Sequence, residues 1–524
     1  MITDVIVSNL PAFLVAVPLL AAFLCPLVGR ISPNIRAAWV FAAMALTAAI
    51  AYCLAYLVYT GGTVIYVFGA TAADLSIPLD SGGIPIRIMF TVDPMSALME
   101  IIAVTVGLGV IIYSLSSDER RSGLENYYTI FLLLISAVLG MVSTGDIFNF
   151  FVFLEISSLA TAGLVAYRVE KGLAVEAGLK YLMVSTIAGI FFLFAIGILY
   201  GQYNALNMAI IAERIQWTPL DKIALVLIVA SLAAKCGSVP MHFWTPDAYM
   251  MAPAAVTAML VVASQASLYG LFRFVFTVYG VSLNYVTMGW VVIILGILSM
   301  VVGVTMAIPQ KDIKRLMAYH AVSQTGYMLL GVGVGLAVLG DQFLLNSYGY
   351  TAMEGGIFHI MNHALYKGLL FLTAGAIIYR IGTGDLNRMG GLGHKMKFTM
   401  VFFIIGALAI AGIPPFNGFA SKFLIYESVY QFNPILAVIA MVVSILTLAS
   451  FVKVFHAVFM GPPREEHAQV REVPLPMLGA MAFLAILVIV SGLFPGIFVT
   501  NLIEPAVHAL TDQAGYMTIV LGGG

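Results

Sequence analysis

Long apolar runs alternate with short polar connections along the whole chain. A run of about twenty apolar residues is long enough for a helix to cross the ~30 Å hydrocarbon core of a bilayer. We therefore predict an all-α polytopic membrane protein of about fourteen transmembrane helices, forming one membrane domain over residues 1–524. The predicted spans are 6–29, 37–60, 93–115, 125–143, 147–167, 176–200, 222–249, 253–279, 285–307, 313–338, 354–380, 398–432, 434–460 and 476–500.

Three of these spans contain helix-breaking residues. A Gly-Ser-Val-Pro segment at 237–240 breaks the span 222–249, and a Gly-Ile-Pro-Pro segment at 412–415 breaks the span 398–432. The third, 354–380, opens with two glycines and carries polar residues along its middle. Broken backbone at membrane depth is tolerated only where protein or water satisfies the freed polar groups. Discontinuous helices are therefore expected.

Charged residues predict the orientation of the chain. Lysine and arginine lie almost entirely in the odd-numbered connections, and only Arg87, Arg214 and Lys222, with Arg273 near a helix end, lie on the other side. Positive charge favours the cytoplasm, so both termini are predicted to be extracytoplasmic. Residues 6–29 lack a basic leader and are expected to form a first spanning helix. The longest extracytoplasmic connection, 61–91, predicts a small hairpin.

Composition excludes other classes of protein. The chain is 61% hydrophobic and 9% charged, with a mean hydropathy of +1.03. Soluble domains contain about 25% charged residues, so a water-exposed globule does not fit. No basic cluster with interleaved aromatic residues indicates a nucleic-acid partner; the expected surroundings are the lipid bilayer. Three cysteines without a CxxC pair are expected to be apolar fillers.

Four ionisable residues lie near the middle of predicted spans, namely Glu155, Lys235, Lys367 and Lys422. Charges at mid-bilayer are costly and mark either an ion path or a structural pair. Burial disfavours the charged form of each group, and a nearby opposite charge counteracts this effect. A Glu155–Lys235 pair would thus be poised to exchange a proton. The alternative is a static salt bridge between two helices.

Two of these lysines adjoin the predicted breaks. Lys235 precedes the first break and Lys422 follows the second, in helices that run across the membrane in opposite directions. Paired discontinuous helices of opposite sense indicate an inverted repeat with ion sites near the midplane. The alternative is that the prolines merely kink their helices.

Histidines form a second group of candidates. His359, His363 and Lys367 are spaced four residues apart, so they line one helix face about 6 Å from one another along the axis. Histidine titrates near neutrality, which suits a proton relay, and His320 and His242 are further candidates. Histidines at this spacing also bind zinc. The adjacent lysine, without a carboxylate or thiol ligand nearby, argues against a metal, and none is predicted.

Asp146 opens the span 147–167, and we expect it to cap the helix N-terminus; it is an accessory candidate only. Lys180, near the inner end of the next span, is expected to reach toward water and would also be placed to influence Glu155. Glu354 precedes the histidines near the outer membrane face.

Several motifs together resemble one family. They are Thr-Gly-Asp-Ile-Phe-Asn-Phe-Phe-Val-Phe-Leu-Glu at 144–155, Ala-Lys-Cys-Gly-Ser-Val-Pro-Met-His-Phe-Trp-Thr-Pro-Asp-Ala at 234–248, Lys-Asp-Ile-Lys-Arg-Leu at 311–316, and the blocks at 359–367 and 414–422. In this order they resemble the antiporter-like subunits shared by respiratory complex I, Mrp-type cation/proton antiporters and membrane-bound hydrogenases. The resemblance covers nearly the whole chain. The opening at 144–149 and a lysine at 422 are closer to the Mrp D subunit and its hydrogenase counterparts.

The resemblance implies a fourteen-helix core with two inverted five-helix repeats, 125–279 and 285–460. It implies Glu155 and Lys235 as the charged pair of one half-channel, Lys367 with its histidines as the central connection, and Lys422 as the terminal residue of the other. It also implies a multi-pass protein of a prokaryotic plasma membrane. One departure is Gln265, which stands where the family often has lysine or histidine and cannot hold a charge.

The leading hypothesis is a proton-translocating subunit of a multisubunit complex, with other membrane subunits as partners and Na⁺ as an exchanging ion left open. No ligands for a flavin, iron–sulfur cluster or nickel–iron centre are evident, so no cofactor and no catalytic residue are expected in this chain. Whether the parent complex is an enzyme stays open. The alternatives are a proton-pumping subunit of a complex I-type NADH:quinone oxidoreductase, a stand-alone secondary transporter, and a structural scaffold.

Overall fold

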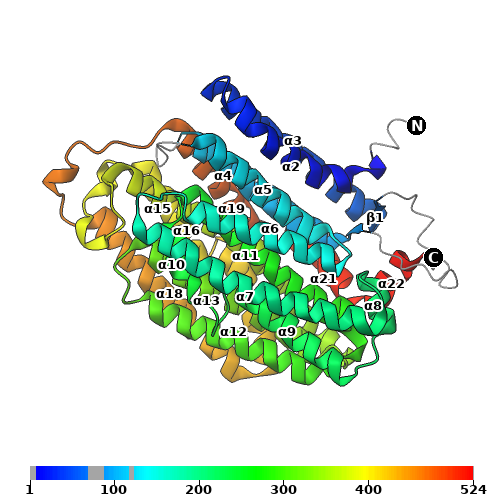
Figure 1. Cartoon of the computed structure of the whole chain (residues 1–524). Helices are drawn as coiled ribbons and strands as arrows, with labels where there is room; N and C mark the ends of the chain where they lie inside the picture. The colour runs from blue at the N-terminus through cyan, green and yellow to red at the C-terminus, as the bar shows by residue number, and fades with distance from the viewer. Residues whose placement is uncertain (1–6, 69–87, 117–122, 523–524) are drawn as a thin grey trace.

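The computed structural model describes residues 7–68, 88–116 and 123–522 as a bundle of long helices lying side by side (Figure 1). Within these residues, eleven helical segments are long and apolar enough to cross a membrane. Their α-helices are α2 (Leu10–Gly29), α3 (Pro33–Gly61), α4 (Pro94–Leu115), α5 (Leu124–Ser143), α6 (Ile147–Val165), α7 (Gly172–Tyr203), α11 (Ala254–Arg273), α12 (Tyr285–Ala307), α15 (Tyr350–Ile381), α18 (Pro434–Phe455) and α19 (Leu475–Leu493). The predicted polytopic helical fold is confirmed.

The three other predicted spans have different structures. Two are discontinuous, being made of α9 (Pro219–Lys235) with α10 (Trp244–Met251) and of α16 (Lys397–Ala411) with α17 (Asn417–Phe432). The third is α13 (Ile313–Ala337), a continuous helix that is buried along nearly its whole length. Its burial permits more polar residues than a lipid-facing helix carries. The count of fourteen crossings stays a prediction.

Both predicted helix breaks are confirmed. Each has a glycine in the left-handed region, Gly237 with φ +74° and Gly412 with φ +75°, which only glycine adopts without steric cost. Each also contains a cis prolyl bond, Val239–Pro240 and Pro414–Pro415. Backbone groups freed at the first break find partners, because Trp244 Nε1 donates to the carbonyl of Ala234 over 2.9 Å. At the second break, Ser444 Oγ donates to the carbonyl of Ala411 over 2.9 Å. Protein groups thus satisfy backbone carbonyls at both breaks, as burial in a membrane requires.

The expected interruption at Gly355–Gly356 is wrong. Helix α15 runs without a break from Tyr350 to Ile381, preceded by a π-helical turn, η5 (Leu345–Gly349). The two glycines instead allow close helix packing. A Cβ atom at Gly355 would lie 2.9 Å from the backbone nitrogen of Ile425 in α17, and one at Gly356 would lie 3.0 Å from the carbonyl of Met328 in α13. These residues are packing glycines and not helix breakers.

The last predicted span, 476–500, is also too long. Helix α19 ends at Leu493, because Pro495 cannot donate the backbone hydrogen bond that would continue it. The chain then continues through α20 (Pro495–Phe498) and a π-helical turn, η10 (Val499–Ile503), into α21 (Glu504–Thr511) and α22 (Gln513–Leu521). The sequence pattern did not predict these terminal helices.

A small sheet lies at one end of the bundle. Strands β1 (Val64–Val67) and β2 (Met89–Val92) pair antiparallel, with Val64 opposite Val92, as expected for a hairpin in the connection 61–91. The connecting residues 69–87 lie outside the described residues. Helices α8 (Met208–Arg214), α21 and α22 gather at the same end as β1 (Figure 1). This is the predicted extracytoplasmic end.

Helix α15 lies at the centre of the bundle. It packs against α11, α13, α16, α17 and α19, and its buried residues extend around its circumference. A helix that is buried on all sides carries few exposed side chains, so its polar residues must find partners inside the protein. This position places the side chains of α15 between the two helix breaks.

Candidate ion-translocation site

The first half of the site is a buried ion pair. Lys235, the last residue of α9, donates from Nζ to Glu155 Oε1 over 2.8 Å and to Ser158 Oγ over 2.5 Å. The lysine side chain is 3% exposed and that of Glu155 is 27% exposed. Gly189 of α7 makes room for the carboxylate, because a Cβ atom there would lie 2.3 Å from Glu155 Oε1. The structure therefore brings the predicted pair together.

Two small cavities continue from this pair toward the bundle centre. The first is lined by Lys235 and by hydroxyl side chains that include Ser158, Thr161 and Ser264. The second shares Ser264 with the first and reaches Gln265 and His363. Hydroxyl and amide groups can hold water in chains of hydrogen bonds. The lysine and the central histidine thus line adjoining cavities that contain hydroxyl and amide groups.

Gln265 makes direct contact with the histidine group. Its amide Nε2 lies 2.7 Å from His363 Nδ1 and donates to the carbonyl of Ile360 over 3.0 Å. When this amide donates to Nδ1, a neutral imidazole carries its proton on Nε2. His363 Nε2 is buried and has no hydrogen-bond partner among the described residues. Gln265 therefore orients the His363 ring without carrying charge itself.

His359 joins the centre to the second half. Its Nδ1 lies 2.9 Å from Ser421 Oγ of α17, and its Nε2 lies 3.1 Å from Gln324 Oε1 of α13. The hydroxyl of Tyr366 lies 3.2 Å from the same Nε2. The rings of His359 and His363 are stacked with centroids 6.5 Å apart. The histidine pair on α15 thus spans from α11 to α17.

Lys367 of the predicted central connection and Lys422 of the second half are held without a carboxylate among the described residues. Lys422 donates from Nζ to the carbonyl of Ile410 over 2.8 Å and to Ser444 Oγ over 2.9 Å, and lies 4.5 Å from the ring centroid of Tyr327. Lys367 donates to the carbonyl of Met317 and lies 5.4 Å from the ring centroid of Phe371. Carbonyl dipoles and aromatic faces stabilise these ammonium groups more weakly than an ion pair does.

Other predicted residues lie outside this connected group. His320 is fully buried, but neither of its ring nitrogens has a hydrogen-bond partner among the described residues. His242 is half-buried in the first break, and its Nδ1 is likewise unpartnered there. Asp146 accepts from the backbone nitrogen of Asn149 over 2.7 Å, which confirms the capping role. Lys180 is 47% exposed and pairs with Glu176 and Asp247, not with Glu155.

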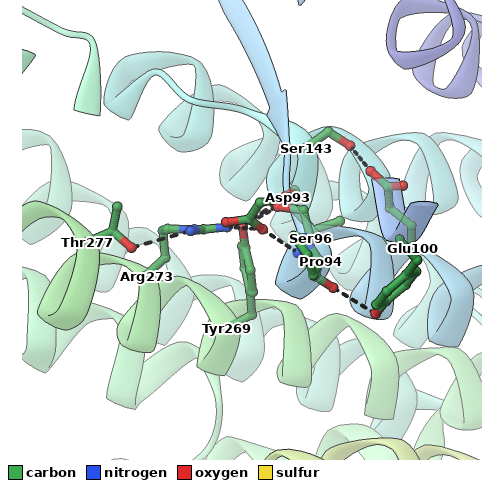
Figure 2. A network of polar contacts seen from close by, with 10 residues as sticks. Asp93, Pro94, Ser96, Glu100, Ser143, Tyr269, Arg273 and Thr277 are labelled. Atoms are coloured by element: carbon green, nitrogen blue, oxygen red, sulfur yellow. Dashed lines mark hydrogen bonds and ion pairs between the residues drawn. The ribbon is translucent and has the colours of Figure 1, made fainter. Parts of the chain in front are cut away.

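Sequence reasoning missed the hydroxyl partners Ser158, Ser421 and Ser444, because serine is too common in membrane helices to mark a site. It also missed a polar network that joins α4 to α11 (Figure 2). Asp93 Oδ1 pairs with Arg273 Nη2 over 2.6 Å, and Glu100 accepts from Ser143 Oγ over 2.7 Å. A carboxylate inside the apolar run 94–115 was the available signal. Among the described residues, no group of three or more histidine, cysteine or acidic side chains is placed to hold a metal ion.

Membrane-length helices with buried lysines at two helix breaks define a polytopic membrane protein with an ionisable interior. Residues 143–447 match the family described as NADH:quinone oxidoreductase/Mrp antiporter, transmembrane. The NADH-quinone oxidoreductase N subunit of Desulforudis audaxviator is 32% identical, with 95% of this chain and 98% of the relative covered. The Na⁺/H⁺ antiporter D subunit of Alkalihalophilus pseudofirmus is 32% identical, with 77% of this chain and 80% of the relative covered.

Solved structures are similar over nearly the full length. A chain of the Mrp complex from Dietzia sp. DQ12-45-1b has a TM-score of 0.85 and 27% identity, covering 98% of this chain and 99% of that chain. A chain of the membrane-bound sulfane sulfur reductase, an archaeal respiratory membrane complex, has a TM-score of 0.85 and 28% identity, covering 97% and 99%. The chain belongs to the antiporter-like membrane-subunit family of NADH:quinone oxidoreductases and Mrp antiporters, as its motifs indicate.

Proposed function

We propose that this chain translocates protons as one subunit of a hetero-oligomeric complex in a prokaryotic plasma membrane. The observation that carries the proposal is a set of buried polar groups: the Glu155–Lys235 pair, the contact between Gln265 and His363, and His359 and Lys422 with their own hydrogen-bond partners. Buried ionisable groups are retained in membrane proteins where an ion must cross. The relatives are named as subunits of larger complexes, which supports a complex here.

The ion pair works as a switch in this proposal. Opposite unit charges 2.8 Å apart interact strongly where water is excluded. A proton that reaches Glu155 neutralises the carboxylate, and Lys235 is left as a buried cation without its counter-ion. Removing one partner of a buried pair strongly destabilises the other charge. Lys235 then releases its proton into the cavity at Ser264, toward Gln265 and His363.

The two histidines carry the proton across the centre. Each ring accepts a proton on one nitrogen and releases one from the other, as a relay requires. Their centroid separation of 6.5 Å is bridged by a water or by the Tyr366 hydroxyl, which lies beside His359. From His359 the proton passes by way of Ser421 to Lys422, which follows the second break. Lys367 lies on the same α15 face and sets the local charge.

The groups along this path favour protons over metal cations. Hard cations prefer several oxygen ligands, whereas lysine and histidine nitrogens dominate here. Na⁺ stays the candidate exchanging ion of the parent complex, because some relatives are named as Na⁺/H⁺ antiporter subunits. The lysine and arginine distribution supports a multi-pass orientation with both termini extracytoplasmic. The helix breaks in 125–279 and 285–460 support the two inverted repeats.

Transport by the assembled complex in inverted membrane vesicles tests the proposal. Glu155→Gln and Lys422→Ala should each abolish proton movement, whereas Glu170→Gln, the same change at an exposed residue, should leave it intact. Proton movement at the control rate in both variants would refute the role of this path. Co-purification in mild detergent identifies the partner subunits, and proton transport by the purified chain alone would refute the multisubunit proposal.

A further inference from the structure

Glu100 is a buried carboxyl group that the path above does not use. It lies on α4 with no exposed surface, and its Oε1 accepts from Ser143 Oγ over 2.7 Å. Its Oε2 is also buried and has no hydrogen-bond partner among the described residues. An ionised carboxylate in this setting would lack most of its usual donors. The neutral, protonated form is favoured, because it avoids burying an uncompensated charge.

A paired carboxylate lies on the same helix nearer the predicted extracytoplasmic end. Asp93 caps the N-terminus of α4 and pairs with Arg273, and both side chains are 3% exposed. Arg273 Nη2 also donates to Ser96 Oγ over 3.1 Å, and Arg273 Nε donates to the Tyr269 hydroxyl over 3.0 Å (Figure 2). The Asp93 charge is therefore compensated, whereas the Glu100 carboxyl has no such partner.

One face of α11 connects this network to the central histidines. Gln265, Tyr269 and Arg273 are spaced four residues apart, so each lies about 6 Å along the axis from the next. The amide of Gln265 contacts His363, and the Tyr269 hydroxyl lies 2.9 Å from Ser96 Oγ. A polar stripe thus runs along α11 from the centre of the bundle to its outer end.

The end of α5 joins the same stripe to Glu100. The Tyr269 hydroxyl donates to the carbonyl of Val142 over 3.0 Å. The next residue, Ser143, donates to Glu100. From α3, the Tyr59 hydroxyl donates to the carbonyl of Pro94 over 3.0 Å, fewer than two helix turns from Glu100. Glu100 therefore borders the stripe.

The other charged groups around this part of α4 are few. Helix α21 brings Glu504 and His508, both with side chains about half exposed, and α22 brings Tyr516 against Arg273 at 5.4 Å from the ring centroid. Helix α15 carries Lys367, which is held by the carbonyl of Met317. Helix α19 carries no charged residue. Among the described residues, none of these groups forms an ion pair with Glu100.

We propose that Glu100 is a further proton-binding residue of this chain, on a branch that leaves the central path at Gln265 and follows α11 to the Asp93–Arg273 pair. The inference rests on the proposed proton translocation. A proton that arrives from His363 passes along the hydroxyls of Tyr269 and Ser96 and through intervening water, and Glu100 holds it before release at the extracytoplasmic end. Gln265 then acts as a branch point, since it orients His363 and borders both routes.

The variant Glu100→Gln tests this role with little structural change. Glutamine keeps the size of the side chain and an acceptor oxygen for Ser143, but it has no exchangeable acidic proton. We expect proton transport by the assembled complex to fall about tenfold or more, as when an acid–base group is lost. Glu213→Gln on α8 is the matched control, because that carboxylate is exposed at the same end of the bundle. Transport at the control rate would overturn the proposal.

A second measurement reports on Glu100 without transport. Infrared spectroscopy of the purified complex should show a protonated carboxyl band that Glu100→Gln removes and Glu155→Gln leaves in place. A spectrum unchanged by Glu100→Gln would overturn the proposal. Unimpaired transport in both Glu155→Gln and Lys422→Ala would instead refute the proposed function. The infrared band would still report on Glu100 in that case.

The variant Ser143→Ala covers the case in which Glu100→Gln fails to assemble. It retains the carboxyl group and removes its hydrogen-bond donor. The carboxyl band should shift, and transport should fall by a smaller factor than in Glu100→Gln. An unshifted band together with control-rate transport in Ser143→Ala would overturn the proposal.

Discussion

Gly189→Ala is expected to slow proton transport without disturbing the fold. The added Cβ atom would lie 2.3 Å from Glu155 Oε1, whereas ordinary contacts of this kind begin near 3.4 Å. The carboxylate must therefore move by about 1 Å. It is the far end of a flexible side chain, so the carboxylate moves and the helices stay in place. Alanine also favours the helix over glycine by ~1 kcal/mol, which protects stability.

The magnitude follows from the ion-pair distance. Lengthening the Lys235–Glu155 contact from 2.8 Å by about 1 Å weakens the Coulomb attraction by about 1.5 kcal/mol at an effective dielectric constant of about 20. Movement of Lys235 and solvent near the partly exposed Glu155 reduce this value. We expect transport to fall about three- to tenfold, given that about 1.4 kcal/mol corresponds to a factor of ten.

Proton uptake into inverted vesicles, measured with a pH-sensitive dye at matched subunit content, provides the assay. Gly197→Ala on the same helix is the control, because a Cβ atom there meets nothing within 4 Å. Equal initial rates in the Gly189→Ala and Gly197→Ala complexes would refute the reasoning. So would a loss of assembly in Gly189→Ala, because the argument requires the carboxylate to yield and not the helices.

Substitutions at three further contacts extend the test. Gln265→Leu should lower vesicle transport by about tenfold, because removing one of two buried hydrogen-bonded partners costs about 1–3 kcal/mol. Gln265→His should retain most of the transport. Equal rates in the leucine and histidine variants would contradict this. Ser444→Ala removes a hydrogen-bond acceptor of Lys422 and should slow transport several-fold with unchanged assembly. A normal rate would contradict this and show that the Ile410 carbonyl alone is enough to hold Lys422. Asp93→Asn should destabilise the complex by about 3–5 kcal/mol, because Arg273 loses its buried partner, and the loss should appear as a lower melting temperature. The double variant with Arg273→Met should recover stability. A double variant no more stable than the single one would contradict this.

The buried pair and both helix breaks were predictable from sequence because each has a local signature. Glu155 and Lys235 stand out as charges within apolar runs, and the breaks combine glycine with proline. The contact between Gln265 and His363 joins residues 98 positions apart. The spacing of residues along one helix does not show which other helix that face packs against. The family resemblance, and not periodicity, placed Gln265 beside the central path.

Other features depended on packing that no local pattern encodes. Gly355 and Gly356 have the composition of a break, yet the close approach of α13 and α17 holds them in a continuous helix. Glu100 was missed because it adjoins neither a break nor a basic residue in the sequence. Its network joins α4 to α11 across more than 170 residues of chain, as with Ser96 and Tyr269, which lie 173 positions apart. The polar environment of a buried carboxyl group emerges only when the helices have packed.

The way Lys367 and Lys422 are held limits how much charge the interior can store. Both are buried, and among the described residues their nearest partners are carbonyl oxygens, one hydroxyl and aromatic faces, with Glu155 paired to Lys235 alone. Such dipolar partners stabilise a single added cation but cannot neutralise several at once. Simultaneous protonation of both lysines and a nearby histidine would therefore be self-limiting. In the proposed path, protons would therefore pass one after another without accumulating, and the rate of transport would depend on how fast the last group releases its proton.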